Sequence, residues 1–213
     1  KQVADETARM IAHWMRVGFV HGVMNTDNMS IHGLTIDYGP YGWLEDYNLD
    51  WTPNTTDLTR KRYRFGHQAQ IGEWNFARLL EAISPLMSEP DILYEALDFY
   101  QSSFNKYNQQ MWADKLGLGE FITDDENLVI ELTSLLQSVE TDMTIFFRLL
   151  SSITKPDINQ LKIAFYQEEE IPENEWNIWL KKWWGRIDGE PCQEQMKLAN
   201  PKYVLRNWMA QLA

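Results

Sequence analysis

The sequence predicts a mainly α-helical fold with one small β-hairpin near its amino terminus. Apolar residues recur at helical spacing over residues 5–18 and again through most of the chain after residue 73. Between these parts, two short apolar runs at 29–31 and 34–36 flank His32-Gly33, a pair with the length of a two-residue hairpin turn. The chain has 213 residues, of which 44% are hydrophobic, so it can build a packed core.

The first helix is expected over residues 5–18, and Gly18 is a suitable residue to end it. Its apolar face consists of residues at helical spacing: Ala4, Ala8, Ile11, Met15 and Gly18. Residues 40–70 are aromatic and polar but show no sustained period. Such a long segment without a period is unusual in a compact domain, so we interpret it as an ordered loop with a functional role.

The same spacing predicts the later helices. A helix over 73–87 is weakened in its last turn by Pro85, and Ser88 is a candidate N-cap for a long helix towards Trp112. Further helices are expected over residues 125–136, 142–151, 157–165 and 173–186. Asn200-Pro201 supplies a cap and a proline at the first position of a last helix over 201–212.

The composition disfavours several classes of partner. The formal net charge is −12, so a broad basic face for nucleic acid is not expected. There is no apolar run of about 18 residues, so no membrane-spanning helix is expected. The single cysteine, Cys192, cannot form a disulfide within the chain. Because the chain lacks an initiator Met and its last helix has no terminator, we expect it to be a piece of a larger protein.

The segment 21–39, HGVMNTDNMSIHGLTIDYG, has the outline of a site for nucleotide phosphates. If the two short runs pair about the turn, Met29 faces Ile36 and, one step further, Asn28 faces Asp37. An amide oxygen and a carboxylate so placed can share one Mg²⁺, which prefers oxygen ligands and takes few of them from protein. Substrate phosphates and water would complete the coordination.

The same segment can be aligned with the catalytic loop of protein kinases, which is His-Arg-Asp, four residues and Asn, followed later by an Asp-aromatic-Gly triplet. Counting from His21, Asn28 falls on the metal-binding Asn, and Asp-Tyr-Gly at 37–39 falls on the triplet. Val23, however, stands where kinases have the catalytic Asp, and valine cannot accept a proton. The nearest carboxylate is Asp27, so the metal ligands are retained while the base is lost or moved.

Simpler interpretations of these residues stay open. Any hairpin can carry Asp and Asn on its surface, so the motif alone leaves a metal site and a plain turn as equal alternatives, and His21 alone is more typical of a structural histidine that bonds nearby backbone. We interpret three loop acids as solvated rather than as ligands: Asp46, Asp50 and Asp57. We interpret a tryptophan-rich segment as helix packing: Trp176, Trp179, Trp183 and Trp184. The glutamate run at 168–170 is expected to be a solvated turn.

Further stretches, together with segment 21–39, resemble a known family. They are YGPYG at 38–42, YRFG at 63–66, Gln68, QIGEWN at 70–75 and NPKYVLRN at 200–207. In this order they extend over nearly the whole chain and resemble the selenoprotein O family (SelO, also called YdiU or UPF0061).

The resemblance implies a protein-kinase-like fold, of which this chain would be the helical carboxy-terminal lobe with a small β-hairpin for the metal-binding residues. Residues 1–88 would form the lobe core with the catalytic loop, the hairpin and an activation-type loop. Residues 89–213 would form the helical remainder, while the amino-terminal lobe and the carboxy-terminal tail would be missing. Members of the family are pseudokinases that bind ATP in a flipped orientation.

The resemblance also implies an activity. Family members use Mg²⁺ or Mn²⁺ to transfer AMP from ATP to Ser, Thr or Tyr hydroxyls of proteins, and they release pyrophosphate. Asp27 matches their proposed catalytic base, and Asn28 and Asp37 match the two metal ligands that hold the nucleotide. The flipped nucleotide accounts for Val23, because with the α-phosphate as target the usual Asp position no longer faces the reacting hydroxyl.

The expected partners are therefore ATP, protein substrates and the missing amino-terminal lobe, with neither nucleic acid nor membrane. The chain by itself is expected to be inactive, because half of the electrostatic clamp on the triphosphate would be missing. The parent would be cytoplasmic if bacterial and mitochondrial if eukaryotic.

Two other functions remain as alternatives. One is a noncatalytic pseudokinase lobe that acts as a helical interaction scaffold. The other is a small-molecule phosphotransferase of the aminoglycoside-kinase type. Those enzymes also have His-Gly before the loop, but they continue with Asp where Val23 stands here.

Overall fold

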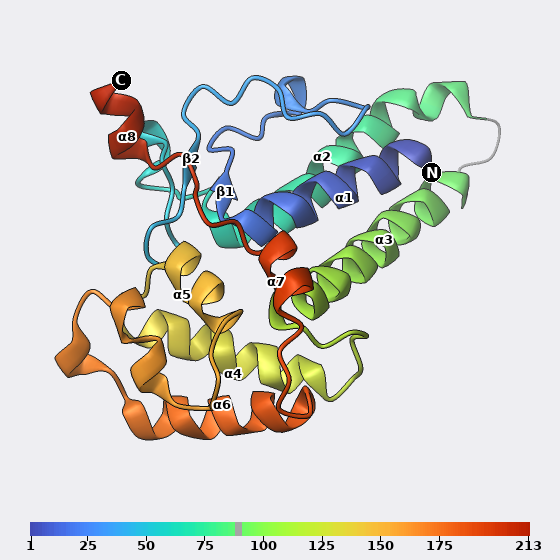
Figure 1. Cartoon of the computed structure of the whole chain (residues 1–213). Helices are drawn as coiled ribbons and strands as arrows, with labels where there is room; N and C mark the ends of the chain where they lie inside the picture. Colours follow the sequence, from blue (N-terminus) through green and yellow to red (C-terminus); the bar gives the residue numbers. More distant parts are fainter. Residues whose placement is uncertain (88–90) are drawn as a thin grey trace. The chain divides into compact units, whose positions relative to one another are not determined.

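The computed structural model describes residues 1–87 and 91–213, with the backbone alone at residue 210. The described chain is mainly helical and contains a two-stranded sheet, which confirms the predicted mainly α class (Figure 1). The predicted N-cap Ser88 lies outside the described residues.

The chain divides into two compact units. The first unit comprises residues 1–43 and 49–108, and the second comprises residues 44–48 and 109–213. The predicted division into residues 1–88 and 89–213 rests on the family resemblance and stays a prediction.

The first unit contains α1 (Gln2–Val17), α2 (Gln68–Ile83) and residues 91–108 of α3 (Asp91–Leu116). Its short elements are β1 (Phe19–Val20), η1 (Thr26–Asn28), β2 (Gly42–Trp43), η2 (Thr55–Asp57), η3 (Phe65–His67) and η4 (Ser84–Leu86), where η denotes a 3₁₀ helix. As predicted, Gly18 ends α1: it has φ 72° and its N–H bonds back to the last turn. α2 begins at Gln68 rather than at the predicted residue 73 and ends at Ile83, and its first residue is a buried polar side chain.

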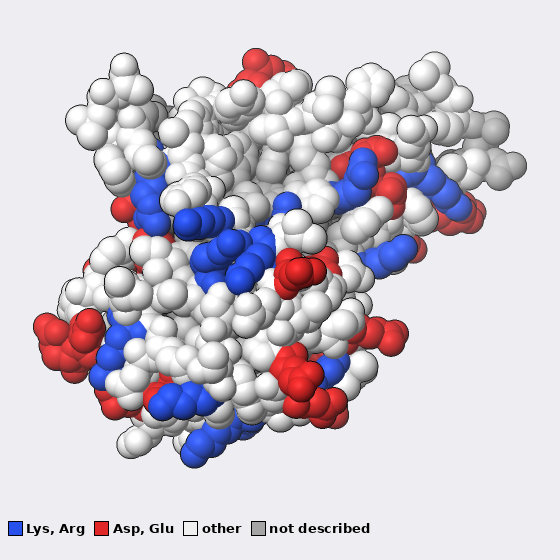
Figure 2. All heavy atoms as spheres, viewed as in Figure 1, with Lys and Arg blue, Asp and Glu red and all other residues white. Residues whose placement is uncertain are grey.

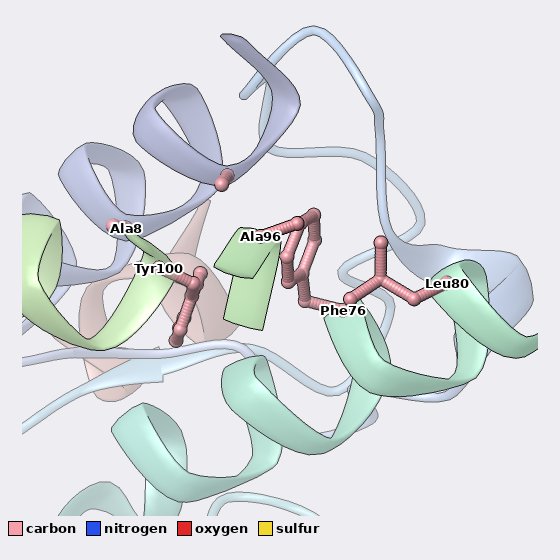
Figure 3. Packing of buried hydrophobic residues seen from close by; sticks show 6 residues of the cluster. Ala8, Phe76, Leu80, Ala96 and Tyr100 are labelled. Carbon is pink, nitrogen blue, oxygen red and sulfur yellow. The ribbon is translucent and has the colours of Figure 1, made fainter. Parts of the chain in front are cut away.

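The core of the first unit lies between its three helices. Figure 3 shows Phe76 and Leu80 of α2 gathered with Ala8 of α1 and with Ala96 and Tyr100 of α3. The rings of Phe76 and Tyr100 stack with their centroids 5.5 Å apart. Small residues on α1 let the helices approach closely. The same holds at Gly72 of α2, where an added Cβ would lie 2.0 Å from Cδ1 of Ile11 and 2.6 Å from the Tyr100 hydroxyl.

The predicted hairpin is wrong in its register and in its strands. The strands that pair are β1 and β2, with Phe19 opposite Trp43. The 29–36 segment contains only an isolated bridge between Met29 and Thr35, instead of the predicted pair of Met29 with Ile36. Asn28 lies in η1 and is therefore not the ladder partner of Asp37.

The reason lies at Gly33, in the turn of that segment. Gly33 has φ 62° and lies close to the backbone of α1. An added Cβ at this position would lie 2.8 Å from the carbonyl oxygen of Glu6. Its N–H bonds to the carbonyl of Ser30 at 3.3 Å. The conformation of the turn is therefore set by its contact with α1 rather than by the geometry of a two-residue hairpin loop.

The predicted loop over residues 40–70 ends at residue 67, because α2 begins at Gln68, and one of its acids was misinterpreted. The carboxylate of Asp57 is buried and accepts hydrogen bonds from the backbone N–H of Arg62 at 3.0 Å and of Tyr63 at 2.7 Å. Asp57 is thus a structural acceptor for backbone groups rather than a solvated acid. Asp50 is exposed and forms an ion pair with Arg64 at 3.0 Å, and Asp46 is half-buried.

The second unit contains the end of α3 and four further helices: α4 (Asp125–Ser138), α5 (Met143–Leu150), α6 (Glu173–Arg186) and α7 (Gln193–Ala199), followed by the short α8 (Asn207–Leu212). Its 3₁₀ helices are η5 (Ile158–Gln160), η6 (Lys162–Ala164) and η7 (Glu168–Glu170). The glutamate run in η7 is exposed, as expected of a solvated turn.

Tryptophans of α6 form the core of this unit. Trp176, Trp179 and Trp183 are each 1% exposed or less, which confirms the prediction of helix packing, while Trp184 is half-exposed. The indole N–H of Trp179 donates to the carbonyl of Leu128 at 2.8 Å, and that of Trp183 donates to Leu116 at 2.8 Å. Each of these two indoles thus buries a large apolar surface and also donates a hydrogen bond to a carbonyl group, in α4 for Trp179 and at the end of α3 for Trp183.

Two predicted helices of this unit are wrong. Residues 157–165 form η5 and η6 instead of one α-helix, because the carbonyl of Ala164 accepts the N–H of Asp142 at 2.7 Å and Phe165 bridges Thr141. The last helix begins at Asn207 rather than at 201. The reason is that the buried Asn200 amide does not cap it: it donates to the carbonyl of Lys115 at 2.9 Å and accepts from Nζ of Lys115 at 3.0 Å.

The surface carries charges of both signs. Figure 2 shows acidic and basic side chains interspersed on the face in view. Among the described helices, none combines the length and the apolar character that crossing a membrane requires.

We predict that Gly72→Ala destabilises the protein by about 1–3 kcal/mol, because the methyl group overpacks the contact between α2, Ile11 and Tyr100. The matched control is Gly185→Ala in α6, where an added Cβ meets no atom within 4 Å. That control is expected to be neutral or to stabilise by up to about 1 kcal/mol. Thermal unfolding followed by circular dichroism would measure both, and equal midpoints for the two variants would contradict the packing argument.

Candidate active site

The candidate site is a loop, residues 21–28, whose backbone is held by three buried side-chain amides. We call these side chains the amide clamp: Asn54, Gln68 and Asn75, which are 9%, 0% and 6% exposed. A loop has no ladder to pair its buried backbone groups, so other donors and acceptors must pair them. The amide clamp supplies both kinds, from the loop that contains η2 and from two turns of α2.

Gln68 connects the end of β1 to the start of the loop. Its Oε1 accepts the backbone N–H of His21 at 3.0 Å, and its Nε2 donates to the carbonyl of Phe19 at 2.8 Å. These two bonds use both ends of one amide, so the side chain cannot rotate without losing them.

The other two members of the amide clamp bind carbonyl groups further along the loop. Nδ2 of Asn54 donates to the carbonyl of Gly22 at 2.9 Å, and Nδ2 of Asn75 donates to the carbonyl of Met24 at 2.9 Å. Gly22 has φ 81°, and an added Cβ there would lie 2.6 Å from the carbonyl oxygen of Pro40. Only glycine fits this position, so the loop backbone is fixed from both sides.

His21 joins the loop to the segment that carries Asp37. Its buried ring accepts the N–H of Val23 at Nδ1 (3.3 Å) and donates from Nε2 to the carbonyl of Ile36 at 2.8 Å. This pattern requires the neutral ring with the proton on Nε2. Burial favours the same form, since it lowers the pKa of His21 despite the opposing effects of the Ile36 carbonyl and of Asp37. The interpretation of His21 as a structural histidine is confirmed.

Asp27 and Asn28 lie on η1, at the exposed end of the loop. Asp27 is exposed, and Asn28 is half-buried. Nδ2 of Asn28 donates to the carbonyl of Val23 at 2.8 Å. Because this bond uses the nitrogen of the amide, the remaining Oδ1 is the atom that Asn28 can offer to a metal or a ligand.

Asp37 is exposed and has φ 50°, in the left-handed region that non-glycine residues adopt uncommonly. Hydrogen bonds connect it to Asn28 in three steps. Asn28 binds the carbonyl of Val23, the N–H of Val23 binds His21, and His21 binds the carbonyl of Ile36, which directly precedes Asp37. His21 and Val23 therefore connect Asn28 to the backbone that precedes Asp37, although Asn28 and Asp37 are not partners in a strand pair.

The donor chemistry of this site fits a hard divalent cation. Asn28 offers an amide oxygen and Asp37 offers a carboxylate, and both are ligands of the type that Mg²⁺ and Mn²⁺ prefer. Among the residues that the structure describes, no group of three or more His, Cys, Asp and Glu side chains is arranged to hold a metal. A site for Mg²⁺ needs fewer protein ligands than that, because substrate phosphates and water supply the rest.

Sequence reasoning missed the amide clamp as a feature of the site. It named Gln68 and Asn75 only as part of a family resemblance, and it did not single out Asn54. A usable signal existed for two of them: Gln68 and Asn75 are seven residues apart and so lie on one face of α2, together with the buried Ile71. Two polar amides on an otherwise apolar helix face indicate buried hydrogen bonds.

Comparison with known proteins identifies the family. The sequence model of the family described as "Protein adenylyltransferase SelO" matches residues 1–213. The chain belongs to the SelO family. Among the SelO relatives, it is 50% identical to "Protein nucleotidyltransferase YdiU" of Flavobacterium johnsoniae, 49% identical to the protein of that name from Aromatoleum aromaticum and 47% identical to that from Rhodopirellula baltica.

These SelO relatives are longer than the present chain. The alignments include all of this chain but only 43%, 42% and 44% of the three relatives, in the same order. The chain thus spans less than half the length of the curated SelO proteins that it matches.

We predict that Gln68→Leu lowers the stability of the protein by at least about 2 kcal/mol. The substitution keeps the size of the side chain but leaves the N–H of His21 and the carbonyl of Phe19 buried without partners, at about 1–3 kcal/mol each. The control is Gln70→Leu, the same change at an exposed position of α2, where a change within about 0.5 kcal/mol is expected. Chemical denaturation would measure both, and similar losses would show that Gln68 has no special role.

The protonation of His21 leads to a second prediction. Its pKa is lowered in the folded state, so the unfolded chain binds the proton first and stability falls as the pH drops below about 6.5. A His21→Leu variant lacks this contribution, so its unfolding midpoint should fall less between pH 7 and pH 5 than that of the wild type. His13, whose pKa is also lowered by burial, is present in both proteins and cancels in the difference. Parallel pH profiles would contradict the assignment of a neutral ring.

Proposed function

We propose that this chain carries the metal-binding and acid–base residues of a protein adenylyltransferase, which transfers AMP from ATP to Ser, Thr or Tyr hydroxyls of proteins. One observation carries the proposal. The spacing of His21, Asn28 and Asp37 matches that of a kinase catalytic loop and its metal-binding triplet, yet the position of the usual base holds Val23. Membership of the SelO family supports the same chemistry.

Three side chains take roles in the proposed reaction. Oδ1 of Asn28 and the carboxylate of Asp37 would hold Mg²⁺ or Mn²⁺, whose charge offsets that of the ATP phosphates. The acceptor hydroxyl oxygen forms a bond to the α-phosphorus of ATP, Asp27 accepts the hydroxyl proton, and the bond to the leaving pyrophosphate breaks. Val23 takes no part in proton transfer, which is consistent with a base that has moved to Asp27.

The rest of the parent protein is needed for this activity in the proposal. The chain spans less than half the length of its relatives. In the proposal, the amino-terminal lobe of the parent contributes the remaining phosphate contacts. The chain by itself is proposed to be inactive for this reason. The relatives named above are bacterial proteins, which favours the cytoplasmic alternative for the parent.

We predict that Asp27→Asn and Asp37→Asn in the full-length parent each reduce AMP transfer about 100-fold or more. The first removes the base and the second removes a charged metal ligand, and asparagine tolerates the left-handed backbone at residue 37. Asp98→Asn, on the exposed side of α3, is the matched control and should retain full activity. Intact mass spectrometry of target proteins after incubation with ATP and Mg²⁺ provides the measurement.

The same experiment separates the alternatives. An added phosphate with release of ADP would point to a phosphotransferase. A scaffold without catalysis would transfer nothing and would not be stabilised by ATP against thermal unfolding. Undiminished AMP transfer by both Asp variants would contradict the assigned residues.

A further inference from the structure

A group of basic side chains belongs to the long loop between β2 and α2, and the reaction described above does not use it. Four of the chain's 19 Lys and Arg residues fall within five positions: Arg60, Lys61, Arg62 and Arg64. We call residues 60–64 the basic segment. The chain as a whole has a net charge of −12, so this segment differs in sign from the rest of the molecule. A local concentration of positive charge on an acidic protein indicates a surface that attracts negatively charged groups.

Only part of the charge of the basic segment is offset by the described chain. Arg64 forms an ion pair with Asp50 at 3.0 Å and donates to the carbonyl of Lys61 at 3.1 Å. Arg60, Lys61 and Arg62 are exposed, and they form no ion pair with any residue that the structure describes. Their charges are therefore available to a bound partner.

Arg62 is held in place without an acidic partner for its guanidinium. Its backbone N–H donates to Oδ1 of the buried Asp57 at 3.0 Å. Its guanidinium carbon lies 4.6 Å from the ring centroid of Trp74 and 5.6 Å from that of Tyr63. A guanidinium that stacks on an aromatic face keeps its N–H donors available, because they point outward in its own plane. Arg62 is thus ordered in advance for a carboxylate, which can accept two of these donors at once.

The two aromatic side chains beside this guanidinium are both connected to the candidate catalytic loop. The hydroxyl of Tyr63 donates to Oδ1 of Asn25, which lies two positions before Asp27 and directly precedes η1. Trp74 directly precedes Asn75 of the amide clamp, which donates to a carbonyl of the same loop at 2.9 Å. Helix α2, which carries Trp74, also contacts η1. The basic segment therefore adjoins the loop that carries the candidate base.

We propose that the basic segment binds acidic residues of the protein substrate. Arg62 selects a glutamate or aspartate that lies close in sequence to the modified hydroxyl, because its stacked guanidinium matches a carboxylate in both charge and shape. Arg60 and Lys61 add electrostatic attraction for the same acidic stretch. The substrate class is therefore proteins that carry acidic residues around the accepting Ser, Thr or Tyr. The proposal rests on the proposed adenylyltransferase function.

The test uses the full-length parent with ATP, Mg²⁺ and synthetic peptides that each contain one serine and no other hydroxyl side chain. Glutamate is placed at each of the four positions before and after the serine, which span roughly 14 Å of extended chain on either side. Glutamine at the same position keeps the shape of the side chain without its charge. We expect a position at which glutamate raises kcat/KM about 10-fold over glutamine, and this ratio should fall as the salt concentration rises.

Variants of Arg62 test the location of the site. Arg62→Gln should reduce the ratio of glutamate to glutamine to less than threefold. Arg62→Glu should react faster with a peptide that has lysine at the selected position than with the glutamate peptide. The matched control is Lys106→Gln, which removes one positive charge from an exposed position of α3 and should retain the preference for glutamate. Thermal midpoints show whether the variants are folded, and the peptide series with the wild type tests the preference without any variant.

The outcomes are distinguishable. Transfer of AMP to serine peptides by the wild type without any preference for glutamate over glutamine would overturn the substrate class and leave the proposed function intact. A preference that persists in both Arg62 variants would overturn the role of Arg62. An equal rise of the KM for ATP with every peptide in Arg62→Gln, with the preference unchanged, would assign the guanidinium to the phosphates of ATP and would also overturn that role. Failure of the wild-type parent to transfer AMP to any peptide or protein would overturn the proposed function, and the acidic substrate class with it.

Discussion

The hydrogen bonds of the amide clamp are the constraint on which the rest of the candidate site depends. The first part of the loop, residues 21–24, is largely buried and lies outside any helix or strand, so its buried carbonyl and N–H groups must be paired inside the protein. Gln68, Asn54 and Asn75 pair them from segments that lie roughly 30 to 50 residues further along the chain. A loop held in this way is already ordered before a substrate binds. Such order in advance is the condition for preorganised electrostatic catalysis.

The site combines a buried, uncharged support with an exposed, charged end. His21 is neutral because burial lowers its pKa, and only the neutral ring can accept from Val23 and donate to Ile36 at the same time. Asp27 and Asp37, in contrast, are exposed. Charge is thus kept out of the buried support, where it would be costly, and lies at the surface instead.

Several features of this protein follow from local patterns in its sequence. Apolar spacing predicted the mainly helical class, Gly18 predicted the end of α1, and the tryptophans of α6 were assigned correctly to packing. The kinase-like spacing selected Asn28 and Asp37, and Asp27 was selected as the nearest carboxylate and by the family resemblance; the roles of all three remain predictions. The partners of the buried polar groups, in contrast, depend on how distant segments pack together. The conformation of the turn at Gly33 depends on its contact with α1. Asn200 binds Lys115 instead of capping a helix, and the buried carboxylate of Asp57 accepts hydrogen bonds from backbone N–H groups. Periodicity reports which face of an element is apolar, but a hydrogen bond between distant residues depends on how the elements meet, and no local pattern encodes that.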